Sequence, residues 1–258
     1  MTGFPASGWL RFKASPEVTG WIAHVRPIAD AIAHDPQHAH WLRHGGTWFV
    51  GVNLLPNDAS GAVDGGPPLQ GEAMDFLRRY TAPAPVALEP GQVSVCYHGY
   101  PQASADESEA AFRFRRDRDA AHLDGLMAEG LAKRRFLRES HAFVLGIPLV
   151  EVSAGMAPFV IWEGSHEIIR TAFSRAFAGI DPARWHEVDV TEIYQTARRE
   201  IFSSCTRVEV LTKPGEVYAV HRMALHGMAP WTAAHTGARP VIYFRPELAH
   251  METWLSAP

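Results

Sequence analysis

Cysteine is scarce in this chain of 258 residues: Cys96 and Cys205 are too few for a disulfide scaffold. No apolar run approaches the roughly 18 residues that a membrane-spanning helix needs, and the first residues lack the basic and apolar regions of a secretory signal. Nor is there an excess of basic residues, since the formal net charge is -4. We therefore expect a cytoplasmic protein that binds neither nucleic acid nor membranes.

Several common catalytic motifs are also missing. The sequence contains no G-x-G-x-x-G, P-loop, G-x-S-x-G or Cys-pair metal motif, and the stretch that begins His166-Glu167 has Arg170 where an H-E-x-x-H zinc motif needs a second histidine. Histidine itself is abundant, with fourteen copies. Because imidazole is the commonest metal ligand in proteins, the histidines whose spacing suits a metal ion are the first candidates for chemistry.

The pattern of apolar residues predicts many short strands and few helices. Helices are expected over residues 16–32 and 72–80, from an N-cap at Ser165, and from a capping box of Asp189 and Glu192 to about residue 203. The expected strands cover residues 47–55, 92–97, 142–150, 158–162, 207–211, 217–225 and 241–244. The predicted fold class is mostly β with flanking helices (α+β), a barrel or sandwich of the jelly-roll kind.

The domain organisation follows from length and from one linker-like segment. A chain of 258 residues fits one large domain, and residues 82–85 are too short to separate two. We expect a single domain over residues 1–258. Residues 1–90 would form an N-terminal layer of helices and strands, and residues 91–248 the β core that carries the chemistry.

Two distant stretches contain the strongest candidates for a metal site. His122 and Asp124 are separated by one residue, and in extended chain such residues point to the same side. His226, which ends a strand-like run and precedes Gly227, is the predicted third ligand, with His221 as its rival. Two histidines and one carboxylate leave three positions of a metal ion open, which is typical of non-haem Fe(II) oxygenases.

Arg239 begins the next predicted strand after His226. Its planar guanidinium matches a carboxylate in two hydrogen bonds, which suits a five-carbon diacid that chelates the metal with its other end. Arg222 and Arg245 are rivals for this role, and Arg245 shares a strand face with Arg239 by parity. The alternative interpretation of Arg239 is a surface ion pair.

These motifs together resemble the phytanoyl-CoA dioxygenase-like branch of the Fe(II)/2-oxoglutarate oxygenases. The resemblance covers roughly residues 90–248. It lies in an H-x-D motif at His122 and Asp124, a distal His226 104 residues later, Arg239 after a further 13 residues, and a Gly-Ser-His turn that ends at His166.

The resemblance implies a double-stranded β-helix, a cupin-like jelly-roll barrel with Fe(II) at its open end. It implies that His122, Asp124 and His226 bind the iron as catalytic residues, and that Arg239 binds the co-substrate 2-oxoglutarate. Dioxygen would oxidise 2-oxoglutarate to succinate and CO2 while a small organic molecule is hydroxylated. Halogenases of this superfamily lack the carboxylate ligand, so Asp124 argues against halogenation.

Other interpretations stay open at this point. A cupin-like metalloenzyme, either a dioxygenase or an isomerase, needs no 2-oxoglutarate, and a binding or sensor protein needs no metal. The arginines between residues 113 and 118 and the basic residues 133–135 form either an anion-binding rim or a solvated surface. The sequence identifies neither the primary substrate nor the oligomeric state.

Overall fold

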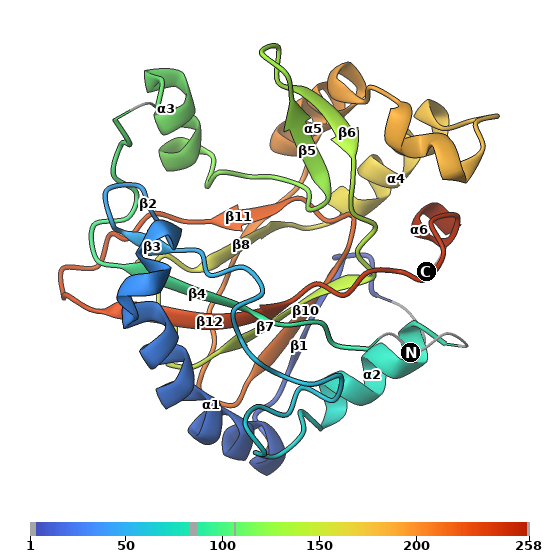
Figure 1. Cartoon of the computed structure of the whole chain (residues 1–258). Coiled ribbons are helices and arrows are strands. Elements are labelled where there is room, and N and C mark those ends of the chain that lie inside the picture. Colours follow the sequence, from blue (N-terminus) through green and yellow to red (C-terminus); the bar gives the residue numbers. More distant parts are fainter. Residues whose placement is uncertain (1–3, 83–86, 106, 257–258) are drawn as a thin grey trace.

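A computed structural model describes residues 4–82, 87–105 and 107–256, and its centre is a pair of facing antiparallel sheets (Figure 1). The larger sheet has seven strands in the order β1-β10-β7-β12-β4-β3-β2. These strands are β1 (Trp9–Phe12), β10 (Val217–His221), β7 (Phe143–Pro148), β12 (Ala238–Phe244), β4 (Gln92–Tyr97), β3 (Trp48–Phe49) and β2 (Leu42–Arg43).

The smaller sheet has the order β11-β8-β9, built from β11 (His226–Met228), β8 (Phe159–Trp162) and β9 (Arg207–Val210). Buried side chains from both sheets pack between them, including Ile161 of β8 and Val220 of β10. A separate hairpin of β5 (Leu126–Glu129) and β6 (Arg134–Leu137) stands above the smaller sheet (Figure 1). The expected mostly β, helix-flanked class is confirmed, but in the described residues no ladder of hydrogen bonds closes the two sheets into a barrel.

Helices cover the outer faces of the sheets. Side chains along β12 point alternately to the two faces of the larger sheet. Ile242 and Phe244 pack in the core against α1 (Pro16–His34) and α2 (Glu72–Tyr80). Val241 and Tyr243, on the other face, point between the sheets. The smaller sheet packs on α4 (Ser165–Ala176) and α5 (Thr191–Ser204), whereas α3 (Glu109–Asp117) and α6 (Thr253–Ser256) are short flanking helices. Two 3-10 helices, η1 (Pro36–Trp41) and η2 (Pro182–Glu187), complete the set.

Local sequence signals predict several elements well. Ser15 caps α1, its hydroxyl accepting a hydrogen bond from the Val18 amide, and Trp21 and Val25 are buried one helical turn apart. The helix expected over residues 72–80 and the strand expected over residues 92–97 have the observed bounds. Hydrophobic periodicity was sufficient for the helix because one of its faces is buried, and the strand alternates polar and apolar residues although residues 92–96 are all buried.

Three expectations were wrong in detail. The strand expected over residues 217–225 ends at His221, and after a turn His226 opens a new strand in the other sheet. Residues 223–225 are fully buried, so hydropathy alone could not reveal the turn. The strand expected over residues 47–55 is limited to Trp48–Phe49, because the chain turns at Gly51, whose φ is 30°.

The third expectation concerned two helix caps. Gly164, in left-handed conformation, is the N-cap of α4, and the Ser165 hydroxyl instead accepts a hydrogen bond from the buried Leu225 amide. Asp189 accepts from the Thr191 amide, while the capping-box partner Glu192 pairs with Arg134. Tertiary partners therefore replace the local cap roles of Ser165 and Glu192, whereas Asp189 keeps a local hydrogen bond at the start of α5.

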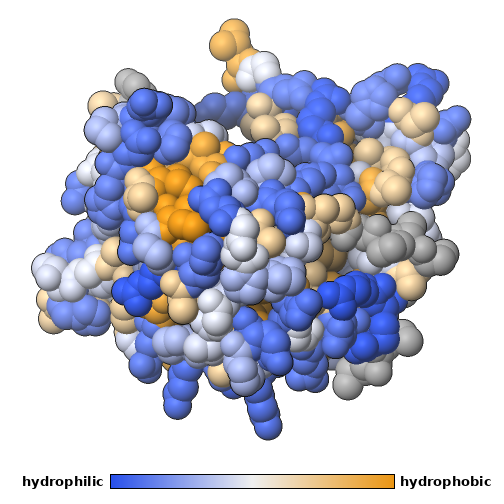
Figure 2. Space-filling view, turned by 60° about the horizontal axis from the view of Figure 1, so that its bottom comes forward, coloured by the Kyte–Doolittle hydropathy of each residue, from blue (hydrophilic) through white to orange (hydrophobic). Residues whose placement is uncertain are grey.

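Residues 1–3, where the sequence shows no secretory signal, and residues 83–86 of the linker-like segment lie outside the described residues. The single-domain organisation stays a prediction. No helix within residues 4–82, 87–105 and 107–256 is long and apolar enough to span a bilayer. The face of the molecule in Figure 2 is mostly hydrophilic, with a hydrophobic patch at its upper left.

Candidate metal centre

A backbone bridge joins the two stretches that hold His122 and His226. The His122 amide donates to the His226 carbonyl at 2.8 Å, and the His226 amide donates back at 3.1 Å. On its other side, β11 pairs with β8. The loop before β5 therefore adds one residue to the open edge of the smaller sheet, and this addition brings the two imidazole rings to a centroid distance of 4.7 Å.

The loop that leads to His122 has an unusual backbone. Asp119 and Ala120 have φ values of 55° and 51°, a left-handed conformation that costs energy for residues other than glycine. The Asp119 carboxylate accepts two hydrogen bonds from Arg207, at 2.7 and 2.9 Å, and its carbonyl accepts from the Met228 amide at 2.8 Å. These contacts with the two edge strands of the smaller sheet, β9 and β11, hold the loop in place.

Gly227 is the point of closest approach between β11 and this loop. A Cβ atom at residue 227 would lie 2.2 Å from the Asp119 carbonyl oxygen, which is backbone and cannot move alone. We expect Gly227→Ala to push the loop off β11, weakening Ni(II) binding by about tenfold or more and lowering stability by about 1–3 kcal/mol. Calorimetric titration and thermal unfolding measure both effects. Gly20→Ala, with no atom within 4 Å, is the matched control, and equal behaviour of the two variants would contradict this account.

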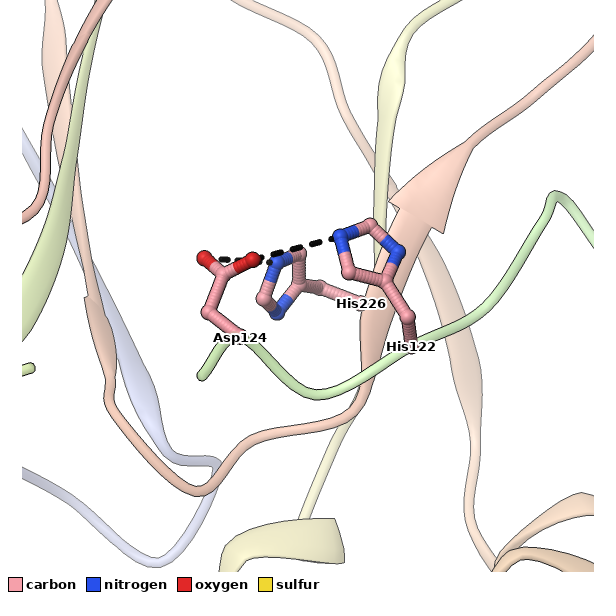
Figure 3. Close-up of side chains that lie close together, drawn as sticks. All are labelled: His122, Asp124 and His226. Atoms are coloured by element: carbon pink, nitrogen blue, oxygen red, sulfur yellow. Dashed lines mark ion pairs between the residues drawn. The ribbon is translucent and has the colours of Figure 1, made fainter. Parts of the chain in front are cut away.

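The three predicted ligands lie together (Figure 3). The Asp124 carboxylate oxygens are 3.3 Å from His122 Nε2 and 3.4 Å from His226 Nε2. One ligand atom from each residue lies within 4.8 Å of the other two. Three side chains from separate parts of the chain thus have the spacing that one metal ion needs.

Backbone carbonyls orient both imidazoles. His122 Nδ1 lies 3.0 Å from the Ala120 carbonyl, and His226 Nδ1 lies 2.9 Å from the Ala224 carbonyl. Because a carbonyl oxygen only accepts, each Nδ1 carries the proton and each Nε2 presents its lone pair toward Asp124. His226 Nε2 is buried and has no hydrogen-bond partner among the described residues. This orphaned acceptor fits a metal ligand.

The charges also suit a metal. Burial by itself would raise the pKa of Asp124, but the Arg245 guanidinium beside the carboxylate is the largest of the effects that lower it, and this pKa lies well below its usual value. Burial lowers the pKa of His226, and the nearby Asp124 carboxylate offsets only part of that effect. The site therefore presents an ionised carboxylate and a neutral buried imidazole, the forms that coordinate a cation.

Arg245 is a neighbour of the site whose contact with Asp124 the sequence did not predict. Its Nε lies 2.6 Å from Asp124 Oδ2, and its Nη1 donates to Gln92 Oε1. Parity had placed Arg245 on the same strand face as Arg239. What parity did not show is that the end of β12 lies beside the loop of Asp124.

Arg239 lies deeper, near the start of β12. It is 1% exposed, its Nη2 is 2.7 Å from Met228 Sδ, and its Nε has no hydrogen-bond partner in the described part of the chain. No described carboxylate pairs with it, so the surface ion-pair interpretation is wrong. The rival Arg222 contacts Tyr80 and the Trp254 carbonyl, away from the three ligands. A buried guanidinium without a carboxylate is costly unless an anion joins it.

A cavity of about 460 Å³ opens onto the three ligands. Both sheets and the loops around them contribute to its walls. Its aromatic and apolar lining includes Trp48, Val50, Val52, Tyr100, Met127, Phe159, Met228 and Tyr243, and its polar lining includes Glu89, Gln92, Ser94, Glu139, His141, Arg245 and Glu247. Arg239 is not in the lining, but its guanidinium contacts Met228, which is. The cavity has the size and mixed chemistry of a small-molecule site.

The remaining sequence candidates lie elsewhere. His221 contacts Arg170 and packs on His166, so the histidine rival faces away from Asp124. None of the arginines between residues 113 and 118, and none of the basic residues 133–135, lines this cavity. Arg116 pairs with Asp117, and Arg134 pairs with Asp189 and Glu192.

No protein-family profile and no curated protein matches the sequence. Solved structures do match. EctD from S. alaskensis, with 2-oxoglutarate and 5-hydroxyectoine, is 14% identical over 95% of this chain and 74% of its own, with a TM-score of 0.50. The chain has the fold of EctD.

Two further matches are weaker in TM-score, at 0.48 each, and both are 14% identical to this chain. HygX from Streptomyces hygroscopicus, with nickel, 2-oxoglutarate and hygromycin B bound, covers 95% of this chain and 84% of its own. SnoK, described as a non-heme alpha ketoglutarate dependent carbocyclase from nogalamycin biosynthesis, covers 93% of this chain and 80% of its own. The fold shared with EctD confirms, at the level of the fold, the resemblance stated from the sequence.

Proposed function

We propose that this chain is an Fe(II)- and 2-oxoglutarate-dependent dioxygenase, related to the phytanoyl-CoA dioxygenase-like enzymes. It would hydroxylate a small organic molecule and release succinate and CO2. The observation that carries the proposal is the convergence of His122, Asp124 and His226 within 4.8 Å at the wall of a cavity. We interpret the paired sheets as the double-stranded β-helix of that family, in one cytoplasmic domain.

In this proposal the three side chains hold Fe(II) on one face. The carbonyls of Ala120 and Ala224 keep both Nε2 atoms aimed at the ion, and Arg245 keeps the Asp124 carboxylate ionised and oriented. Two histidines and one carboxylate would leave three positions of the ion for 2-oxoglutarate and dioxygen. Bound iron, with dioxygen and 2-oxoglutarate, supplies the oxidising chemistry.

Arg239 is the proposed partner of the distal carboxylate of 2-oxoglutarate. The hydroxyls of Tyr218 and Tyr243, 3.0 Å apart, lie on the same side of the larger sheet and add donors near it. The Met228 thioether now contacts the guanidinium, so the co-substrate has to displace this flexible side chain. The anion would compensate the buried positive charge.

Turnover of 2-oxoglutarate without a primary substrate tests this function. Protein loaded with Fe(II) in the absence of oxygen, then exposed to air with 2-oxoglutarate, is expected to form succinate slowly. Succinate is measured by chromatography, and EDTA-treated protein is the control. Protein that binds neither iron nor 2-oxoglutarate would contradict the proposal and indicate a binding or sensor protein.

A cupin-like metalloenzyme that does not use 2-oxoglutarate is the second candidate. The position of Arg239 outside the cavity lining favours it. This candidate predicts tight metal binding with no affinity for 2-oxoglutarate. A calorimetric titration of 2-oxoglutarate into the Ni(II)-loaded protein therefore separates the two functions.

A further inference from the structure

A second cavity, of about 190 Å³, lies on the other side of His122. It shares His122 and Ala120 with the larger cavity, and its other walls come from α3, the β5–β6 hairpin and α5. The side chain of His122 is 48% exposed at this boundary. A molecule seated in the second cavity would therefore lie beside a proposed metal ligand.

Three arginines from three separate elements line this cavity: Arg115 of α3, Arg135 of β6 and Arg198 of α5. The lining contains no aspartate or glutamate among the described residues. Arg115 forms an ion pair with Glu107, but Arg135 and Arg198 have no ion pair with any residue that the structure describes. Like charges gathered in one hollow repel each other unless an anion joins them.

Neutral contacts, not carboxylates, hold the two unpaired arginines. Arg135 Nη1 donates to the Leu126 carbonyl at 3.1 Å, and the Arg135 amide donates to the Thr191 hydroxyl at 2.7 Å. The Arg198 guanidinium lies 4.7 Å from the centre of the Phe114 ring and 5.4 Å from that of Tyr194. These side chains are positioned without losing their charge.

Neighbouring arginines show the contrast. Arg134 pairs with Asp189 and Glu192, and Arg138 pairs with Glu129, so acidic partners are common on this side of the molecule. Arg135, between them in the hairpin, has none. Its charge is therefore available to a ligand from solution.

We propose that this second cavity binds a phosphate monoester group of the primary substrate and so anchors that substrate beside the metal centre. The two unpaired guanidiniums match the roughly -1.5 to -2 charge of a phosphate monoester, whereas a carboxylate would neutralise only one of them. The inference rests on the proposed function. Of the basic residues that the sequence analysis named as a candidate anion-binding rim, Arg115 and Arg135 line this cavity, together with Arg198, which it did not name.

Titration of methyl phosphate into the full-length protein tests the anion site. The experiment is run in EDTA, so that phosphate has no metal to bind. Wild-type protein is expected to bind methyl phosphate at least about tenfold more tightly than acetate at the same ionic strength. Arg135→Gln and Arg198→Gln are each expected to weaken binding by about tenfold or more, since each removes charge-assisted hydrogen bonds.

Arg134→Gln is the matched control, because it removes one charge from the same hairpin but not from the cavity. An equal loss in Arg134→Gln, or equal affinity for acetate and methyl phosphate, would overturn the phosphate site. Arg198→Lys separates the loss of a contact from damage to the fold. It keeps the charge without the planar fork, so it is expected to bind methyl phosphate with an affinity between those of the wild type and Arg198→Gln. Thermal unfolding of each variant tests whether its fold is intact.

The link to the metal centre is tested by ³¹P NMR of methyl phosphate with Mn(II)-loaded protein. Bound methyl phosphate is expected to be broadened by Mn(II) in the wild type and not in Arg198→Gln. Binding without broadening would overturn the role as substrate anchor. Because methyl phosphate binding is also measured in EDTA, where no metal is bound, a wrong metal assignment leaves that readout unchanged.

Discussion

Asp124→Ala is expected to bind Fe(II) at least about 100-fold more weakly than the wild type. Loss of a group that only supports a metal ligand commonly costs 10–100-fold in affinity, and Asp124 is proposed as a direct ligand, so its loss should cost at least as much. It is also the only carboxylate of the candidate cluster. Two neutral imidazoles would remain. The substitution would also remove the ion pair between Arg245 and Asp124, so the positive charge of Arg245 would repel the metal cation.

Calorimetric titration of Fe(II) into metal-free protein under nitrogen measures this effect. Asp117→Ala is a suitable control, since Asp117 is a carboxylate on the same stretch of chain but pairs with Arg116 at the surface. Asp124→Asn keeps the shape of the side chain and one oxygen ligand, so its Fe(II) affinity is expected to lie between those of Asp124→Ala and Asp117→Ala. Fe(II) affinity in Asp124→Ala as high as in the wild type means that the ligand assignment is wrong.

Arg239→Gln is expected to weaken 2-oxoglutarate binding by about 30-fold or more while metal affinity stays unchanged. Removing one partner of a buried, hydrogen-bonded charge pair costs about 2–5 kcal/mol, and Arg239 is 1% exposed. The measurement is a titration of 2-oxoglutarate into Ni(II)-loaded protein. Arg239→Lys, with the charge but no planar fork, is expected to recover only part of the affinity.

Arg245→Gln is the discriminating control for this prediction. Because Arg245 contacts Asp124 directly, its loss is expected to weaken metal binding more than 2-oxoglutarate binding. The reverse pattern, with 2-oxoglutarate lost in Arg245→Gln and retained in Arg239→Gln, would move the clamp to Arg245. If both variants and the wild type bind metal but no 2-oxoglutarate, the cupin-like alternative is correct.

The sequence by itself determined the elements whose signals are local. The apolar spacing of α1, the bounds of α2 and the alternation of polar and apolar residues in β4 depend on residues that are neighbours in the chain. The same is true of the pair His122 and Asp124, since one intervening residue in extended chain puts both side chains on one side. Parity along β12 likewise placed Arg239 and Arg245 on one face.

The sequence named His226 as the partner of His122 and Asp124, but only the tertiary structure decided how these distant residues meet. The turn between His221 and His226 transfers the chain from one sheet to the other, and the bridge from His122 to the edge of β11 assembles the candidate metal centre. The contact of Arg245 with Asp124, and the meeting of Arg135 with Arg198, have the same origin. The periodicity of apolar residues indicates which residues are buried. What lies beside each residue depends on sheet order and loop packing, and these are determined by the whole chain.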